Sequence, residues 1–227
     1  MRHDAEPEVL NTSLNDETAL REYARPYDTY RPGLVPRVLG WFLVACGDLV
    51  YGKKPSYLKF RSVEVIARVP YQSWESAVYT LLTLFYSSEE RAMELCKLSR
   101  FANLAKDNET MHVVVISQFE KRDRKHGVFL RTVIPMIFAF FYYWAAYWLY
   151  LISRRAALEL NYLFEQHAFA QYSEFVEKNA DALKAKSAES AYLAWYGRPC
   201  ANQYEFFRSV RNDELIHRNR SIEEIER

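Results

Sequence analysis

The sequence predicts an all-α protein, and three observations lead to that fold class. Glycine is scarce, with 6 residues among 227, which argues against barrels and sandwiches with their many tight turns. Half of the residues are hydrophobic, which is ample material for a buried core. Apolar stretches of helical length follow one another between short polar breaks.

The first part of the chain combines a polar segment with two predicted helices. Residues 1–32 are polar and mostly acidic, so we expect a loose N-terminal arm without the character of a secretory signal or transit peptide. An apolar helix is predicted over residues 34–50, where Gly52-Lys53-Lys54-Pro55 breaks it. A second helix is predicted over residues 56–87, with a bend at Pro70 because proline removes a backbone hydrogen bond.

The remainder of the chain predicts four more helices. Ser88-Glu89-Glu90 is a plausible helix start. The helix that begins there should end at about Phe119, and the charged run at residues 120–126 should form a loop. Gly197-Arg198-Pro199 breaks the chain near its end. We expect one domain over residues 33–220 and a short tail at residues 221–227. The four helices are predicted over residues 88–119, 133–152, 156–186 and 203–219.

Charge and cysteine content exclude several kinds of site. The 30 Lys and Arg residues nearly balance the 29 Asp and Glu residues, so the chain has no basic footprint for nucleic acid. Cys46, Cys96 and Cys200 are odd in number and far apart, which suits neither a disulfide framework nor a zinc or iron–sulfur site. We interpret them as small core residues of a protein in a reducing compartment.

Two Glu-x-x-His units carry the main chemical signal. They are Glu109 with His112 and Glu214 with His217. Residues three apart lie on one face of a helix, so a carboxylate and an imidazole can hold the same metal ion. One such pair alone would be read as a solvated helix face. Two pairs weigh more, because the chain has only 5 histidines.

Two further glutamates complete a ligand set for two metal ions. Glu64 lies among apolar neighbours, where a lone carboxylate would be costly, and Glu165 lies on the helix predicted at residues 156–186. The order Glu, Glu-x-x-His, Glu, Glu-x-x-His is typical of ferritin-like di-iron four-helix bundles. Four carboxylates and two imidazoles suit iron or manganese, so we expect a di-iron centre.

Tyr172 follows Glu165 by close to two helical turns, so both side chains share a face. Beside two iron ions, a tyrosine can donate an electron and a proton. Without them, it would be an ordinary core tyrosine. The remaining histidines, His3, His126 and His167, are interpreted as solvated or core residues.

Four ordered segments make the chain resemble the alternative oxidases, and among them it is more similar to the plastid terminal oxidases. The resemblance covers roughly residues 34–220 and implies a quinol:oxygen oxidoreductase that makes water without pumping protons. The four segments are Val63-Glu64-Val65-Ile66-Ala67-Arg68-Val69-Pro70-Tyr71, Asn108-Glu109-Thr110-Met111-His112, Phe164-Glu165-Gln166-His167-Ala168 with Tyr172, and Arg211-Asn212-Asp213-Glu214-Leu215-Ile216-His217.

The resemblance also implies roles for individual residues. Tyr172 matches the tyrosine near the metals, and Asn108 and Asp213 match positions that hydrogen-bond the ligands. Lys59, Val63 and Gln171 fall where the family lines its quinol pocket. The implied metal ligands are Glu64, Glu109, His112, Glu165, Glu214 and His217.

The chain departs from the family pattern at a few positions. Lys59 stands where the mitochondrial type has arginine, and lysine cannot make a planar two-pronged contact. Glu165 stands alone where the mitochondrial type has three consecutive glutamates. The segment between Tyr172 and Glu214 is shorter than in plastid enzymes. The quinone species and the organelle therefore stay open.

Residues 133–152 carry no charge and, taken alone, predict a transmembrane helix. Half of the implied ligands precede this segment and half follow it, so a single crossing would separate them. We therefore expect it to lie in one leaflet or to pack in the bundle. With residues 34–50, its aromatic side chains would form a membrane-surface plateau. Cations at the edge, serving headgroup binding or ordinary solubility, are Arg37, Lys53, Lys54, Arg131, Arg154 and Arg155.

The sequence thus predicts a membrane-bound quinol oxidase acting on plastoquinol or ubiquinol and on O2. The thylakoid membrane is the expected location, with a mitochondrial inner membrane or a bacterial membrane as alternatives, and the resemblance implies a homodimer. Two other hypotheses stay open: a di-iron hydroxylase of a quinone precursor, and a metal-free helical membrane protein with an interaction role. Product analysis and metal analysis would separate the three.

Overall fold

The structure is a computed structural model that describes residues 5–123 and 127–226. Within these residues the chain forms helices and turns, and its only β-pairing is an isolated bridge between Ser187 and Asn202. The predicted all-α fold class is confirmed. The chain divides into two compact units, which are described separately: a terminal unit (Met1–Trp41 with Glu159–Arg227) and a central unit (Phe42–Leu158).

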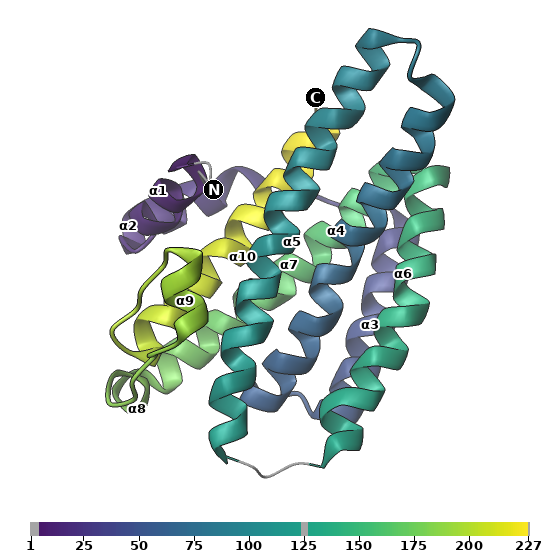
Figure 1. Ribbon diagram of the computed structural model, residues 1–227. Coiled ribbons are helices and arrows are strands. Elements are labelled where there is room, and N and C mark those ends of the chain that lie inside the picture. The colour runs from purple at the N-terminus through teal and green to yellow at the C-terminus, as the bar shows by residue number, and fades with distance from the viewer. Residues whose placement is uncertain (1–4, 124–126, 227) are drawn as a thin grey trace. The chain divides into compact units, whose positions relative to one another are not determined.

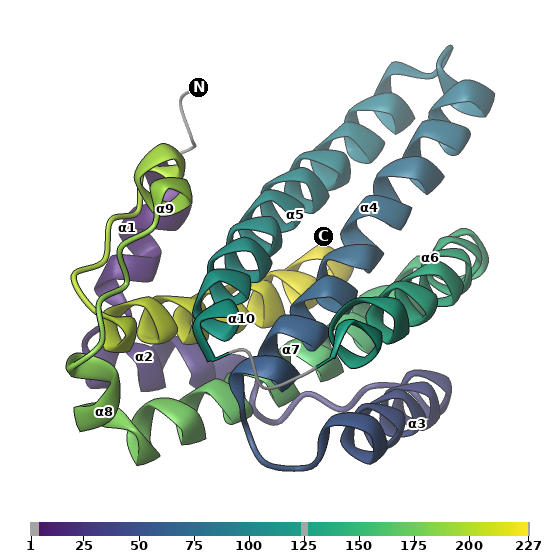
Figure 2. The same cartoon turned by 60° about the horizontal axis from the view of Figure 1, so that its bottom comes forward.

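The central unit is built on α4 (Tyr57–Phe85), α5 (Glu89–Asp123) and α6 (Ile134–Ile152). α4 packs against both α5 and α6, as both views show (Figures 1 and 2). Aromatic rings fill the contact: the Trp74 ring lies 5.4 Å from that of Tyr71 and 6.0 Å from that of Tyr150. The helices predicted at residues 56–87 and 88–119 are therefore confirmed, with shifted ends.

Local signals explain where α4 begins and continues. The Ser56 side chain caps the helix by accepting a hydrogen bond from the backbone N–H of Lys59 at 3.2 Å. α4 continues as one helix through Pro70, and the Ser73 hydroxyl donates to the Pro70 carbonyl at 2.8 Å. The bend expected at this proline stays a prediction.

The charged run after residue 119 differs from the expected loop. α5 continues to Asp123, while residues 124–126 lie outside the described part of the chain. Glu120 is buried and pairs with Arg131 at 2.6 Å, so this charged residue belongs to the interior of the unit rather than to a solvated loop. Arg131 lies on a π-helix, η2 (Phe129–Val133), which leads directly into α6.

The terminal unit is organised around α10 (Gln203–Glu226). Two short helices, α1 (Ala5–Ser13) and α2 (Glu17–Ala24), pack on it (Figures 1 and 2), and Leu14 and Leu20 are buried with Leu215 and Ile216. Residues 5–13 and 17–24 are thus helical where a loose arm was expected. Residues 221–226, expected to be a tail, continue α10. The expected single domain over residues 33–220 stays a prediction.

Other elements of this unit refine the predicted boundaries. The helix expected at residues 156–186 is divided into α7 (Arg154–Lys178) and α8 (Ala180–Lys184). Asn179 ends α7, and its side-chain amide donates to the Phe175 carbonyl at 2.9 Å, which competes with further helix. α9 (Ala191–Tyr196) ends at Gly197, whose φ of +91° most residues avoid.

α3 (Leu34–Tyr51) confirms the first apolar helix, and Gly52, with φ of +83°, ends it as predicted. α3 and the segment Phe129–Ile152 are each long and apolar enough to cross a membrane, by length and composition alone. Large apolar side chains on both are exposed. Examples are Trp41 and Leu49 on α3 and Phe141 and Trp148 on α6.

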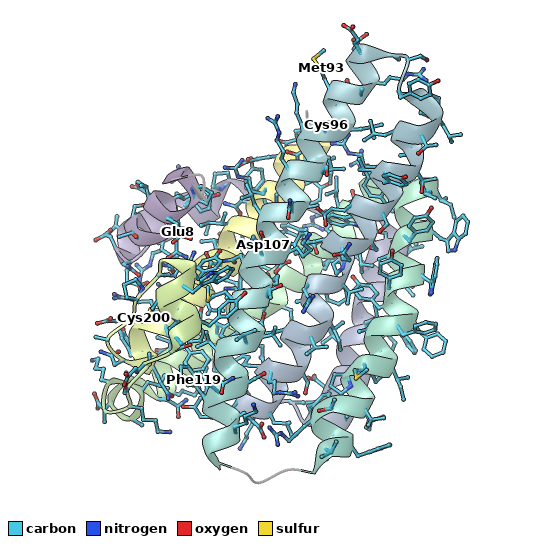
Figure 3. All side chains as sticks on the ribbon, viewed as in Figure 1. Glu8, Met93, Cys96, Asp107, Phe119 and Cys200 are labelled. Carbon is cyan, nitrogen blue, oxygen red and sulfur yellow. The ribbon has the colours of Figure 1, made fainter. Side chains whose placement is uncertain are left out.

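The three cysteines are free, and they are not all core residues. Cys96 is exposed on α5 (Figure 3), so its interpretation as a core residue was wrong, while Cys46 and Cys200 are half-buried. His167 is half-buried on α7, and His3 and His126 lie outside the described residues.

Candidate functional site

A buried cluster of two carboxylates and one imidazole lies in the central unit. Glu64 comes from α4, and Glu109 and His112 come from α5; each is exposed by 1% or less. His112 Nδ1 lies 3.3 Å from Glu64 Oε2 and 3.4 Å from Glu109 Oε2. Each residue offers a ligand atom within 4.8 Å of the others, so one metal ion could be held here.

The electrostatics of this central cluster favour a cation. Burial, followed by the neighbouring Glu109 carboxylate, raises the pKa of Glu64 well above its ordinary range. Two carboxylates packed together in the interior resist full ionisation unless positive charge lies beside them. A divalent ion would supply that charge and hold both groups ionised. The donor set therefore fits a metal ion better than it fits a metal-free core.

A second cluster of the same composition lies in the terminal unit. Glu165 comes from α7, and Glu214 and His217 come from α10; their exposed fractions are 2%, 1% and 6%. Their ligand atoms also lie within 4.8 Å of one another. The spacing of Glu214 and His217 places both on one face of α10, as the Glu-x-x-His pattern predicts. Each unit thus holds half of the predicted ligand set.

Two residues that orient the terminal cluster were not predicted. The Asn161 amide donates to Glu165 Oε1 at 3.1 Å and to the Ser221 hydroxyl at 3.1 Å. The Ser221 hydroxyl in turn donates to the His217 carbonyl at 2.9 Å. A signal was present, since Asn161 precedes Glu165 and Ser221 follows His217 by four residues, about one helical turn.

The two residues expected beside the ligands are both buried. Asn108 directly precedes Glu109 on α5 and is 6% exposed. Asp213 directly precedes Glu214, and its Oδ1 accepts hydrogen bonds from the Asn11 amide at 2.6 Å and from Arg198 at 3.2 Å. Neither Asn11 nor Arg198 was predicted. Asn11 lies 202 residues from Asp213 and Arg198 lies 15 residues from it, so no local sequence motif links either residue to Asp213. The roles of Asn108 and Asp213 stay predictions.

Tyr172 is buried in the terminal unit, where its ring stacks on that of Phe207 with centroids 6.2 Å apart. Its predicted role as an electron donor is not tested by this packing. Among the expected quinol-pocket residues, Val63 and Gln171 are half-buried. The Lys59 ammonium is buried and donates to Asp48 Oδ1 at 2.8 Å and to the Lys53 carbonyl at 3.1 Å. Its charge is therefore already balanced, and the pocket stays a prediction.

Comparison with known proteins supports the resemblance first seen in the motifs. Ubiquinol oxidase 4, chloroplastic/chromoplastic, from Arabidopsis thaliana is 26% identical over 190 residues, covering 75% of this chain and 51% of that protein. The chain thus spans about half the length of this curated relative. The family model for alternative oxidase matches residues 41–223, which include both clusters. The chain therefore belongs to the alternative oxidase family.

Proposed function

We propose that the central and terminal clusters together bind two iron ions, and that the chain is a quinol:oxygen oxidoreductase at a membrane surface. The observation that carries this proposal is the pair of buried Glu-Glu-His clusters, one in each unit, within a chain of the alternative oxidase family. Four carboxylates would offset the charge of two divalent ions, and the oxygen-rich donor set suits iron. The ligand-bearing helices would then form the predicted four-helix bundle.

The chain's own residues would divide the work of the reaction. A bound pair of iron ions would supply the electron transfer between quinol and oxygen. Tyr172, buried on α7 two turns beyond Glu165, would donate an electron and its phenolic proton. Asn161 would hold Glu165 in place through its hydrogen bond. Burial around both clusters would keep bulk water away.

The name of the Arabidopsis relative, a ubiquinol oxidase of chloroplasts and chromoplasts, supports a quinol substrate and a plastid location. We extend both to this chain, with plastoquinol or ubiquinol as the reductant and O2 as the oxidant. Lys59, Val63 and Gln171 would line the quinol pocket. The thylakoid membrane is the proposed location, with the mitochondrial inner membrane and bacterial membranes as alternatives, and the homodimer implied by the family is proposed with it.

Exposed apolar side chains on α3 and α6 support attachment to a lipid surface. Leu49 is 87% exposed on α3, and Phe141 and Trp148 are 67% and 56% exposed on α6. Tryptophan favours the membrane interface, and phenylalanine and leucine are typical of the apolar face of a helix that lies in it. Lys53, Lys54 and Arg155 are exposed and would meet lipid headgroups. Arg131, also expected at the edge, pairs with Glu120. Both helices would lie along one leaflet and supply quinol from the lipid phase.

The test is oxygen uptake by the purified chain with a soluble quinol. The wild type should consume oxygen and contain about two iron ions per chain. Glu214→Ala should abolish uptake, while Glu177→Ala, an exposed glutamate on α7, should leave it unchanged. A hydroxylated ring among the products would instead support the alternative hypothesis, a di-iron hydroxylase of a quinone precursor. A chain that takes up no iron would favour the metal-free interaction protein instead.

A further inference from the structure

Arg198 connects α1 to the ligand-bearing helix α10 within the terminal unit. Its Nε and Nη2 donate to the carboxylate of Glu8 (Figure 3) at 2.8 and 2.6 Å. Its Nη1 donates to Asp213 Oδ2, and its Nη2 to Asp213 Oδ1 at 3.2 Å. One guanidinium therefore makes a two-pronged pair with each of two carboxylates, a geometry that the planar fork of arginine allows and lysine cannot copy.

Arg198, Asp213 and Glu8 form an ion cluster that is largely shielded from solvent on the side of Arg198 and Asp213. The side chains of Arg198 and Asp213 are 10% and 6% exposed, and that of Glu8 is 35% exposed. Burial alone would lower the pKa of Arg198, but the Asp213 charge and the hydrogen bonds to Glu8 and Asp213 raise it above its ordinary value. Arg198 therefore remains a cation between the carboxyl groups of Asp213 and Glu8.

The backbone places Arg198 before α10 begins. Gly197, with φ of +91°, ends α9 and turns the chain. The N–H groups of Gly197 and Arg198 both donate to the Leu193 carbonyl, at 3.0 and 3.1 Å. The start of the Arg198 side chain is therefore fixed by local structure, so its guanidinium does not have to be ordered by Asp213 alone.

An uncharged residue of α1, Asn11, also contacts this part of α10. The Asn11 amide donates to Asp213 Oδ1 at 2.6 Å and to the Ser209 carbonyl at 2.8 Å. Asn212 returns a hydrogen bond to the Asn11 carbonyl at 3.0 Å. Asp213 directly precedes Glu214 and lies one turn before His217. Any rotation of α10 that moved these two ligand candidates would break the contacts to α1.

We propose that Arg198 is a positioning residue: through it, Glu8 of α1 holds Asp213 and so sets the orientation in which α10 presents Glu214 and His217 to a metal ion. The inference rests on the proposed function. α1 lies outside residues 41–223, the part that the alternative oxidase family model matches. A segment beyond the matched region would therefore tune the metal site without contributing a ligand.

Iron affinity, measured by competition with a chelator, tests the proposal directly. Arg198→Ala should weaken iron binding about 10–100-fold, as expected when a group that orients ligands is lost. The kcat for oxygen uptake should fall with it, while the KM for quinol stays unchanged. Arg198→Lys should recover only part of the affinity, because lysine cannot form both pairs. Arg208→Ala, which removes a guanidinium lying over the Tyr204 ring on α10, should bind iron like the wild type.

Glu8→Gln keeps the shape of the partly exposed side chain and removes only its charge, so it decides the question if Arg198→Ala does not fold. Circular dichroism would establish folding for each variant. Folded Glu8→Gln should bind iron more weakly than the wild type. Wild-type iron affinity in folded Glu8→Gln, or in folded Arg198→Ala, would overturn the positioning role. A wild-type chain that binds no iron would instead end the proposed function.

Discussion

His112 Nδ1 lies 3.3 Å from Glu64 Oε2, which sets an imidazole of α5 against a carboxylate of α4 deep in the central unit. Both residues are exposed by 1% or less, and Glu109 adds a second carboxylate to the same space. Such a group of charges reduces the stability of a protein without metal, since buried ionised groups are costly. A buried site that costs stability is typical of function rather than of folding.

Glu64→Gln is expected to abolish iron binding at the central cluster and yet to stabilise the metal-free chain. Glutamine keeps the shape of the side chain and removes a carboxyl group whose pKa burial raises. We expect a gain of about 1–2 kcal/mol in the free energy of unfolding, measured on chelator-treated protein. Glu94→Gln, at an exposed position of α5, should change neither property. Lower stability of metal-free Glu64→Gln would contradict this view of the cluster.

Iron removal should lower the melting temperature of the wild type. A ligand that binds only the folded state, at a free concentration 100 times its Kd, adds about 2.7 kcal/mol to stability. Differential scanning calorimetry with and without a chelator measures this shift. Glu214→Ala should show a much smaller shift, because part of the donor set is missing. Equal shifts in both proteins would mean that iron stabilises the chain elsewhere.

Tyr172→Phe is expected to keep its fold and iron content while losing turnover. Phenylalanine preserves the stacking on Phe207 but has no phenolic proton to donate. Loss of a group that transfers a proton usually slows a reaction about 100-fold or more. Oxygen uptake measures the effect, and Tyr79→Phe, at an exposed position on α4, is the matched control. Full turnover in Tyr172→Phe would remove this residue from the mechanism.

Glu159→Ala should destabilise the terminal unit. The Glu159 carboxylate, 4% exposed, accepts hydrogen bonds from the Tyr30 hydroxyl at 2.8 Å and from the Gly33 backbone at 2.9 Å. Losing two hydrogen bonds to a buried charged acceptor costs about 2–4 kcal/mol. Urea unfolding gives the value, and Glu177→Ala is the exposed reference. A change within about 0.5 kcal/mol would place this contact among the ordinary surface contacts.

Cys96 and Cys200 should differ sharply in reactivity. Burial raises the pKa of the Cys200 thiol to about 11, so at pH 8 nearly all of it is protonated and inert to alkylation. Cys96 is exposed and should be labelled by iodoacetamide in the native protein. Raising the pH towards 11 should increase labelling of Cys200 by releasing its thiolate. Peptide mass spectrometry reads both sites, and rapid labelling of Cys200 at pH 8 would contradict the expected order.

The sequence was sufficient to predict the long helices and the residue types of both clusters. Hydrophobic periodicity and Glu-x-x-His spacing act over a few helical turns, so they are visible in any single stretch such as that from Glu109 to His112. The same short range explains why the helix ends at Gly52 and Gly197 could be predicted from neighbouring residues alone. Whether all six predicted ligands share one centre stays a prediction.

The N-terminal helices escaped prediction because their stability comes from distant partners. α1 and α2 are short and polar, and isolated helices of that length are marginal in water. Arg218 of α10 donates to Asp28 at 2.8 Å and to the Ala24 carbonyl at 2.6 Å, while Asn219 donates to the Tyr23 carbonyl at 2.7 Å. No pattern within residues 1–32 reports contacts made by residues near the other end of the chain.

The π-helix η2 has a consequence for which side of α6 faces its neighbours. A π-turn holds one residue more than an α-turn, and each residue of an α-helix turns the chain by about 100°. With Arg131 anchored on Glu120, removing one residue from η2 would rotate α6 by that angle about its own axis. Tyr142 and Tyr150 would leave the interior, and Tyr143, Tyr147 and Leu151 would take the buried places of Tyr142, Ala146 and Tyr150. The number of residues in η2 therefore determines which side chains of α6 are buried and which are exposed.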